Sequence, residues 1–255
     1  MSDISLFDGF CRIGKSRVKR RGEISGAEQL LGEMDYFGIE EALVHHVVAV
    51  ENHPRLGNEL LMKELKGYGR LNPCWVLLPA ATEELAPASE LVAQMLEQGV
   101  RAARLCPSPE GAGVHHGYGM SQRVCGPLLA VLEAHRIPLF IDLARLTWLQ
   151  VDEICSTYPE LPLVVTDVGY RINRELYPRL ESYENLYIEL SRYEVHNGLE
   201  DISARFGVHH LIFGGGMPVY TPGATIAMVA CADISQEEKA LIGGGNLRNL
   251  LKAVR

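Results

Sequence analysis

Eight short apolar runs, each followed by a segment of helical periodicity, limit the folds open to this chain more than any other feature. The runs are continuous rather than alternating, which is typical of strands buried on both faces of a parallel sheet. Eight such units within 255 residues, with no long linker, predict a (β/α)8 TIM barrel of the α/β class that fills residues 1–255 as a single domain. The expected strands are residues 5–11, 41–47, 74–79, 101–105, 138–142, 163–166, 186–190 and 210–213.

A doubly wound open sheet is the alternative arrangement of the same elements. Its nucleotide-binding version is disfavoured, because no G-x-G-x-x-G follows the first apolar run. The expected helices between the strands are residues 26–37, 55–66, 86–98, 127–135, 148–158, 173–181 and 199–206, followed by a helical region at the C-terminus.

Composition and charge exclude several classes of function. The net charge of −8 argues against nucleic acid or an anionic membrane as the main partner. No apolar run approaches the length of a membrane span, and the N-terminus lacks an export pattern. The six cysteines are scattered without a C-x-x-C pair, which predicts reduced thiols in a cytoplasmic protein. We therefore expect a soluble cytoplasmic protein with a small-molecule substrate, and a homo-oligomer is compatible with the sequence.

Polar residues stand where the expected strands end. In a barrel of this kind the chemistry is found at the carboxyl ends of the strands, so these residues predict a site there. Polar residues at strand ends can also be merely exposed to solvent or paired with each other. Six of the eight expected strands end in an ionisable residue, however, and this number favours a site. The residues at these ends are Phe10, Arg12, His45, His46, Arg104, Asp142, Asp167, Glu189, Ser191 and the glycines 214–216.

Five segments carry motifs in a recognisable order: FDGFCRIG at 7–14, IPLFID at 137–142, YPELPLVVTDVG at 158–169, LIFGGGMP at 211–218 and IGGGNLRNLL at 242–251. Together they resemble the amidohydrolase superfamily, in the branch of small TIM-barrel, metal-dependent hydrolases related to decarboxylases and lactonases. The first segment is similar to I-D-x-H-x-H-x-G, the third to Y-P-x-L-x-x-x-x-x-H-x-G and the fourth to L-L-F-G-S-D-x-P. The resemblance spans nearly the whole chain and implies the same barrel.

The resemblance also implies where metal ligands would be, and this sequence departs from it at each of those positions. The five ligand positions of the superfamily fall on Phe10, Arg12, Asp142, Asp167 and Gly216. A divergent member without the usual zinc or iron centre is therefore expected, and no cofactor is predicted. The alternative is a divalent metal held by Asp142, Asp167 and Glu189, although Arg12 would then place a like charge beside the ion.

Without a metal, the guanidinium of Arg12 is expected to lie between Asp142 and Asp167. These three residues are the predicted catalytic group, because two neighbouring carboxylates push their pKa values apart and one can act as an acid or base. A purely structural arginine–aspartate network is the competing interpretation. The predicted substrate-binding residues are Arg104, His45, His46, Glu189, Ser191, Gly215, Gly216 and His115, the last in a glycine-rich loop that could close over the site.

Two classes of function remain open from the sequence. The first is a metal-independent amidohydrolase-like hydrolase, lactonase or lyase acting on a small molecule that bears hydroxyl or carboxylate groups. The second is a non-catalytic relative that serves as a small-molecule binding protein. Loss of turnover after substitution of one carboxylate would separate the two classes.

Overall fold

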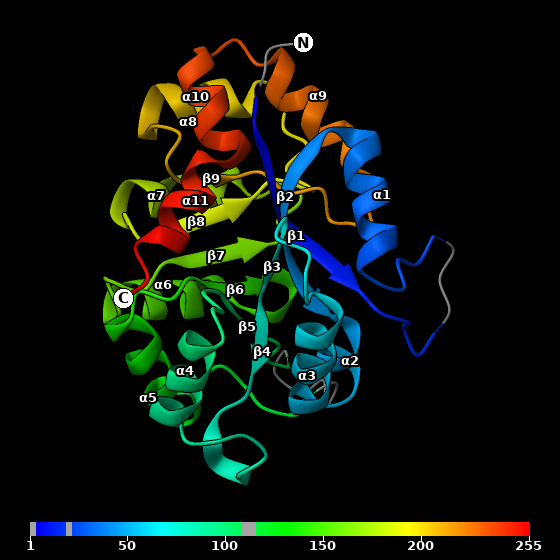
Figure 1. Ribbon diagram of the computed structural model, residues 1–255. Coiled ribbons are helices and arrows are strands. Elements are labelled where there is room, and N and C mark those ends of the chain that lie inside the picture. The colour runs from blue at the N-terminus through cyan, green and yellow to red at the C-terminus, as the bar shows by residue number, and fades with distance from the viewer. Residues whose placement is uncertain (1–3, 19–21, 109–115) are drawn as a thin grey trace.

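The strands of the protein run parallel to one another and pair in chain order (Figure 1). The computed structural model describes residues 4–18, 22–108 and 116–255. Within them the pairing forms two groups, β1 to β3 and β4 to β9. The strands are β1 Leu6–Ile13, β2 Ile39–His46, β3 Leu71–Pro73, β4 Trp75–Leu77, β5 Ala103–Leu105, β6 Leu139–Asp142, β7 Leu163–Thr166, β8 Leu186–Glu189 and β9 Leu211–Ile212.

Backbone hydrogen bonds join the two groups into one barrel. Strands β3 and β4 are separated by Cys74 alone, whose N–H donates to the Val44 carbonyl at 2.8 Å, while the N–H of Trp75 donates to Ala102 at 3.1 Å. On the opposite side, the N–H of Gly9 donates to the carbonyl of Phe213 at 2.9 Å, which ties β1 to the end of β9. The predicted (β/α)8 barrel is confirmed, with β3 and β4 as two parts of its third strand.

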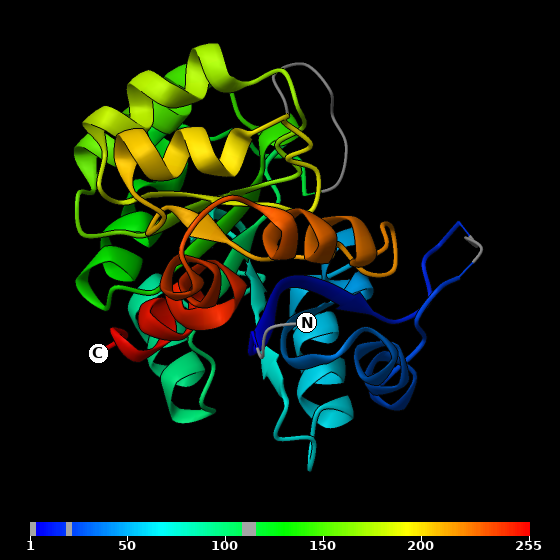
Figure 2. The same ribbon diagram turned by 90° about the horizontal axis from the view of Figure 1, so that it is seen from above.

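Helices surround the strands on the outside, as the two views in Figure 1 and Figure 2 show. Among the described residues, none of these helices has both the length and the apolar character needed to cross a membrane. The helices are α1 Ala27–Phe37, α2 Val47–Glu51, α3 Pro54–Glu64, α4 Ala88–Glu97, α5 Gln122–Ala134, α6 Trp148–Thr157, α7 Asn173–Ser182, α8 Gly198–Phe206, α9 Gly223–Cys231, α10 Gln236–Ala240 and α11 Asn246–Lys252.

Apolar side chains fill the barrel at the end where the strands begin. Phe7, Phe140 and Ile212 come from different strands and form one buried cluster with Leu247 and Leu251 of α11. In Figure 1, α11 lies at the left, on the side where β7 and β8 begin, and the arrows of these two strands point away from it. Because α11 closes the amino end, the carboxyl ends of the strands remain as the open end of the barrel.

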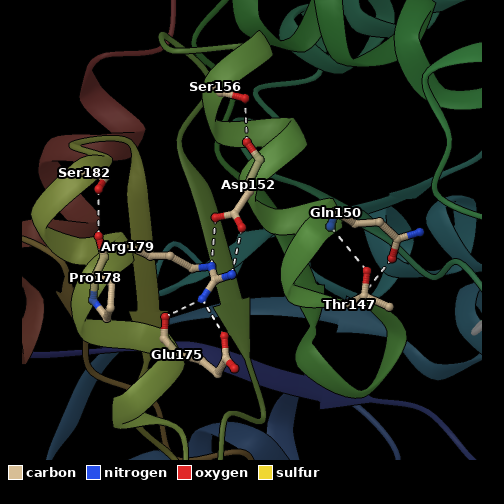
Figure 3. Close-up of polar contacts among 8 residues, drawn as sticks. All are labelled: Thr147, Gln150, Asp152, Ser156, Glu175, Pro178, Arg179 and Ser182. Atoms are coloured by element: carbon tan, nitrogen blue, oxygen red, sulfur yellow. Dashed lines mark hydrogen bonds and ion pairs between the residues drawn. The ribbon is translucent and has the colours of Figure 1, made fainter.

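The outer layer is held by polar contacts as well as by packing. Arg179 of α7 donates from Nε and Nη2 to the two carboxylate oxygens of Asp152 in α6, at 2.8 and 2.7 Å (Figure 3). Its Nη1 donates to Glu175 Oε2 at 2.8 Å, and the guanidinium lies 4.8 Å from the ring centre of Trp148. This bidentate pair fixes α6 against α7 in the layer outside β6 and β7.

Most boundaries differ from the predicted ones by a few residues, and two of the differences have a clear consequence for the local structure. Helix α5 begins at Gln122 rather than at Pro127, and Pro127 lies inside it. The expected second strand, residues 41–47, ends at His46, and Val47 starts the short helix α2. The His46 side chain accepts a hydrogen bond from the N–H of Val48, and this cap turns the chain from strand to helix at that point.

Candidate active site at the carboxyl end of the barrel

Strand alternation explains which side chains enter the barrel. Successive side chains of a strand point to opposite faces, so residues two apart point the same way. Leu43, Ala102 and Phe140 belong to the cluster inside the barrel. The residues two positions further along are therefore directed inward, one level closer to the open end. By the same alternation the inward polar residues of the neighbouring strands form one group: His45, Arg104, Asp142, Thr166 and Glu189.

Arg104 and Asp142 form a buried ion pair at the centre of this group. Nη1 of Arg104 lies 2.7 Å from Oδ1 of Asp142, and the Arg104 side chain is only 3% exposed. The other oxygen of Asp142 accepts from Nε of Arg145 at 3.2 Å, while Thr166 donates to Oδ1 at 2.6 Å. Burial alone would raise the pKa of Asp142, but Arg104, Thr166 and Arg145 together hold it well below its usual range. Asp142 is therefore a fixed negative charge and a poor proton acceptor, which corrects its predicted role as a base.

Asp167 lies at the rim with partners of its own. Its Oδ1 accepts from Nη1 of Arg192 at 3.0 Å and from the hydroxyl of Tyr220 at 3.2 Å. Asp142 and Asp167 are thus held by arginines other than Arg12, and the prediction that Arg12 bridges them is wrong. The main chain of Arg12 donates to the Met217 carbonyl at 3.0 Å.

Phe10 and His45 form an aromatic wall beside Arg104. Their rings are stacked, with centres 5.9 Å apart and planes at 11°. The guanidinium of Arg104 lies 4.6 Å from the centre of the Phe10 ring. Burial, followed by the charges of Arg104 and Arg12, lowers the pKa of His45 well below its usual range. His45 is therefore neutral near physiological pH, and it lies within the field of Arg12, its neighbour in the β1–β2 pairing.

His46 is directed away from this group, as expected for the neighbour of His45 on a strand. Its Nδ1 accepts from the N–H of Val48, and its Nε2 lies 3.6 Å from Oε1 of Glu64 in α3. The side chain caps α2 and contacts the outer helical layer. The prediction that His46 binds substrate is therefore corrected to a structural role.

A second acidic group lies deeper, where the three consecutive glycines pass. Asp8 of β1 and Glu189 of β8 are both fully buried. A Cβ atom at Gly214 would collide with Oε1 of Glu189, and one at Gly215 would lie 2.6 Å from Oδ2 of Asp8. The N–H of Gly215 donates to Oδ1 of Asp8 at 2.9 Å. The glycine run thus makes room for carboxylates that arrive from two other strands.

These two carboxyl groups keep protons far more readily than free ones. Burial raises the pKa of Asp8 to about 6 and that of Glu189 to about 8. The negative charge of Asp8 contributes to the increase at Glu189, whereas hydrogen bonds from the N–H and hydroxyl of Ser191, at 2.6 and 2.9 Å, oppose it. Within the described residues, Oδ2 of Asp8 is buried without a hydrogen-bond partner. A positive charge, whether a proton or a cation, is therefore stabilised between or beside the carboxyl groups of Asp8 and Glu189.

The remaining predicted residues divide into three groups. Ser191 and Gly215 contact the acid pair directly, through Glu189 and Asp8. Gly216 has a φ of 65°, in the left-handed region, and a Cβ there would lie 2.6 Å from the Tyr220 ring. His115 lies outside the described residues.

Among the members of the site, Asp8, Arg145 and Thr166 are not predicted from the sequence. Asp8 stands inside an apolar run, where burying a carboxyl group costs free energy unless the group is paired or used. Its position in the sequence could therefore have identified it as a candidate site residue. Arg145 comes three residues after Asp142, at the end of a short 3-10 turn, and carries no comparable signal.

The chain belongs to the amidohydrolase family, because the family model described as Amidohydrolase matches residues 25–252. No curated protein sequence matches the chain.

Solved structures with low sequence identity share the whole fold. One is 2,6-dihydroxybenzoate decarboxylase from Rhizobium, 15% identical, with a TM-score of 0.77 and coverage of 97% of this chain and 98% of that chain. A dihydroxybenzoic acid decarboxylase from Polaromonas, with bound manganese and the inhibitor 2-nitroresorcinol, is 16% identical, with a TM-score of 0.75 and 97% coverage of both chains. A 5-carboxyvanillate decarboxylase from Novosphingobium aromaticivorans, also with bound manganese, is 13% identical, with a TM-score of 0.76 and coverage of 98% and 97%. At these identities the likeness establishes the fold.

The prediction of no cofactor is contradicted by the manganese in the last two structures. The ligand set suggested as an alternative is not assembled either, because Asp142 and Asp167 are each paired with arginine. Asp8 and Glu189 fit a divalent ion better. Both are buried, Oδ2 of Asp8 has no partner among the described residues, and carboxylate oxygens are the ligands that manganese and magnesium prefer.

Proposed function

We propose that this protein is a lyase of the amidohydrolase family that removes carbon dioxide from a small aromatic acid bearing hydroxyl groups. The observation that carries the proposal is the buried guanidinium of Arg104 at the open end of the barrel. Nε of Arg104 is buried and has no hydrogen-bond partner within the described residues, while Nη1 is held by Asp142. A buried donor of this kind is costly to leave unused, and a substrate carboxylate is the acceptor that suits a guanidinium.

The surroundings of Arg104 favour a flat substrate. The rings of Phe10 and His45 are nearly parallel and lie beside the Arg104 guanidinium, so a flat aromatic substrate is compatible with these neighbours. Asp142 fixes the orientation of Arg104 and keeps the local charge balanced before the substrate arrives. The names of the structural neighbours, three of them decarboxylases of hydroxylated aromatic acids, support the same class of substrate.

The acid pair of Asp8 and Glu189 bears on the second requirement of the reaction, which is a proton for the ring carbon. Loss of carbon dioxide breaks the bond between the ring carbon and the carboxylate carbon, and the ring carbon then takes up one proton. Glu189, whose pKa is raised to about 8, is the member of the acid pair that holds a proton near neutral pH, whereas Asp8, with a pKa raised to about 6, is mostly ionised there. A divalent metal ion would be held by these two carboxylates in their ionised form and would supply Lewis-acid stabilisation of negative charge, and the ring carbon would then take its proton from water.

A substrate panel tests the reaction class. We expect 2,6-dihydroxybenzoate or a related hydroxylated benzoate, incubated with protein and Mn²⁺, to release carbon dioxide and the matching phenol in equal amounts. Lactones of similar size should not be hydrolysed. Hydrolysis of lactones without decarboxylation would reject the lyase, and tight binding of benzoates without any product would assign the chain to binding instead of catalysis.

A further inference from the structure

A second candidate metal site lies at the opposite end of the barrel from Arg104. Glu184 stands in the loop that leads into β8, and His209 and His210 stand in the loop that leads into β9. Because β8 and β9 pair in parallel, the two loops meet at the amino end of the barrel. One ligand atom from each of the three side chains lies within 4.8 Å of the others, a grouping found nowhere else within the residues the structure describes.

His210 is held in the state that binds a metal. Its side chain is 1% exposed, and its Nδ1 lies 2.7 Å from the carbonyl of Leu186, the first residue of β8. A carbonyl can only accept, so the hydrogen is on Nδ1 and the lone pair is on Nε2. This arrangement, in which a backbone carbonyl fixes the tautomer of a ligating histidine, is typical of metal sites.

The other two side chains can close onto an ion. Nε2 of His209 already lies 3.1 Å from Oε2 of Glu184, and the rings of His209 and His210 are 3.8 Å apart between centres. The side chains of His209 and Glu184 are 46% and 91% exposed, so both can rotate without disturbing the core. Ligands around a tetrahedral zinc are separated by about 3.3 Å, and the three ligand atoms lie within 4.8 Å of one another, so closing onto an ion requires a movement of at most about 1.5 Å.

We propose that Glu184, His209 and His210 bind a transition-metal ion of the zinc class, which links the loops entering β8 and β9. Two imidazoles and one carboxylate are the ligands that zinc, nickel and copper favour, whereas magnesium and calcium favour oxygen alone. Three protein ligands leave a further position for water. The site is distinct from the acid pair of Asp8 and Glu189, because it lies at the amino ends of the strands.

Zinc titration of three variants tests the site. Chelator-treated protein is titrated with Zn²⁺ by calorimetry, with Mg²⁺ as the cation that should not bind here. We expect the affinity of one zinc site to fall by at least about tenfold in His209→Gln and in Glu184→Gln. The matched control is His53→Gln, because His53 is exposed to a similar extent as His209 and also pairs with a glutamate, Glu84, at 4.0 Å, but belongs to no three-ligand group within the described residues.

Two readouts keep the result independent of activity and of folding. The thermal midpoint should rise with zinc in the wild type and in His53→Gln but not in His209→Gln, because binding to the native state stabilises it. Co²⁺ should give the visible absorption of a four- or five-coordinate ion in the same proteins. Equal zinc affinity in the wild type and His209→Gln, with both folded, would overturn the proposal. The zinc result does not depend on the proposed function. Zinc can bind at this site when no substrate of the panel is decarboxylated, and decarboxylation can occur when zinc does not bind here.

Discussion

Metal-free protein is expected to lose stability as the pH rises from about 4.5 to about 8, because Glu189 keeps its proton over that range only when the chain is folded. Below this range the carboxyl group is protonated in both states. Within it the unfolded chain ionises and the folded chain does not, which favours unfolding. Above about 8 both states are ionised and the loss is complete. The difference between the two pKa values corresponds to a loss of about 3–5 kcal/mol, to which Asp8 adds between 3.8 and about 6.

Urea unfolding between pH 4 and 9, with chelator present, measures this dependence. Glu189→Gln removes the ionisable group and should flatten the profile, whereas the exposed Glu153→Gln on α6 should leave it unchanged. Mn²⁺ added to the wild type should also flatten the profile, because an ion bound by the two carboxylates would favour their ionised forms in the folded protein. A wild-type profile that matches that of Glu189→Gln would mean that Glu189 is ionised in the folded protein.

Gly214→Ala is expected to destabilise the protein by about 3 kcal/mol or to prevent folding. The added Cβ would meet Oε1 of Glu189 and would lie 2.7 Å from its Cγ. Glu189 cannot swing aside, because it is fully buried and both its oxygens accept hydrogen bonds from Ser191. The matched control is Gly32→Ala, which lies on the exposed face of α1 with no atom near the added Cβ and should raise stability by about 0.5–1 kcal/mol.

A double-mutant cycle separates the collision from a general weakness at residue 214. Glu189→Ala removes the side chain that the new methyl group meets, so Gly214→Ala should be much less harmful in that background. We expect a coupling energy of about 1–3 kcal/mol from thermal or urea unfolding. Additive effects of the two substitutions would show that the Cβ of residue 214 and the Glu189 side chain do not compete for the same space.

The barrel could be predicted from the sequence because its evidence is local. Continuous apolar runs report burial on both faces, and polar residues at the ends of those runs report the open end of the barrel. The opposite directions of His45 and His46 follow from strand alternation alone, and the structure has them that way. The three consecutive glycines at 214–216 are also visible in the sequence, because they leave no side chain at a position where the resemblance to the amidohydrolase superfamily implies an acid.

The partners within the site could not be predicted, because they depend on how the strands are placed around the barrel. Arg12 and Arg104 both end strands, and the sequence does not say which guanidinium reaches Asp142. The position of Asp8 has a further cause. Pairing of β1 with β2 shifts register between Asp8 and Cys11, and such an irregularity breaks the alternation by which inward residues are recognised. The acids that occupy the space of the missing side chains at 214 and 215 thus come from two other strands, Glu189 from the neighbouring β8 and Asp8 from β1 at the start of the chain.

The most direct test of the central claim is the affinity of the protein for 2,6-dihydroxybenzoate and for resorcinol, the product of its decarboxylation, measured by calorimetry with and without the Arg104 guanidinium. If Arg104 receives the carboxylate, Arg104→Gln should weaken binding of the benzoate by about tenfold to a hundredfold while leaving the weaker binding of resorcinol unchanged. Arg192→Gln, which loses an arginine at the rim, serves as the control, and circular dichroism confirms that each variant is folded. Equal affinity of wild type and Arg104→Gln for the benzoate would contradict the account.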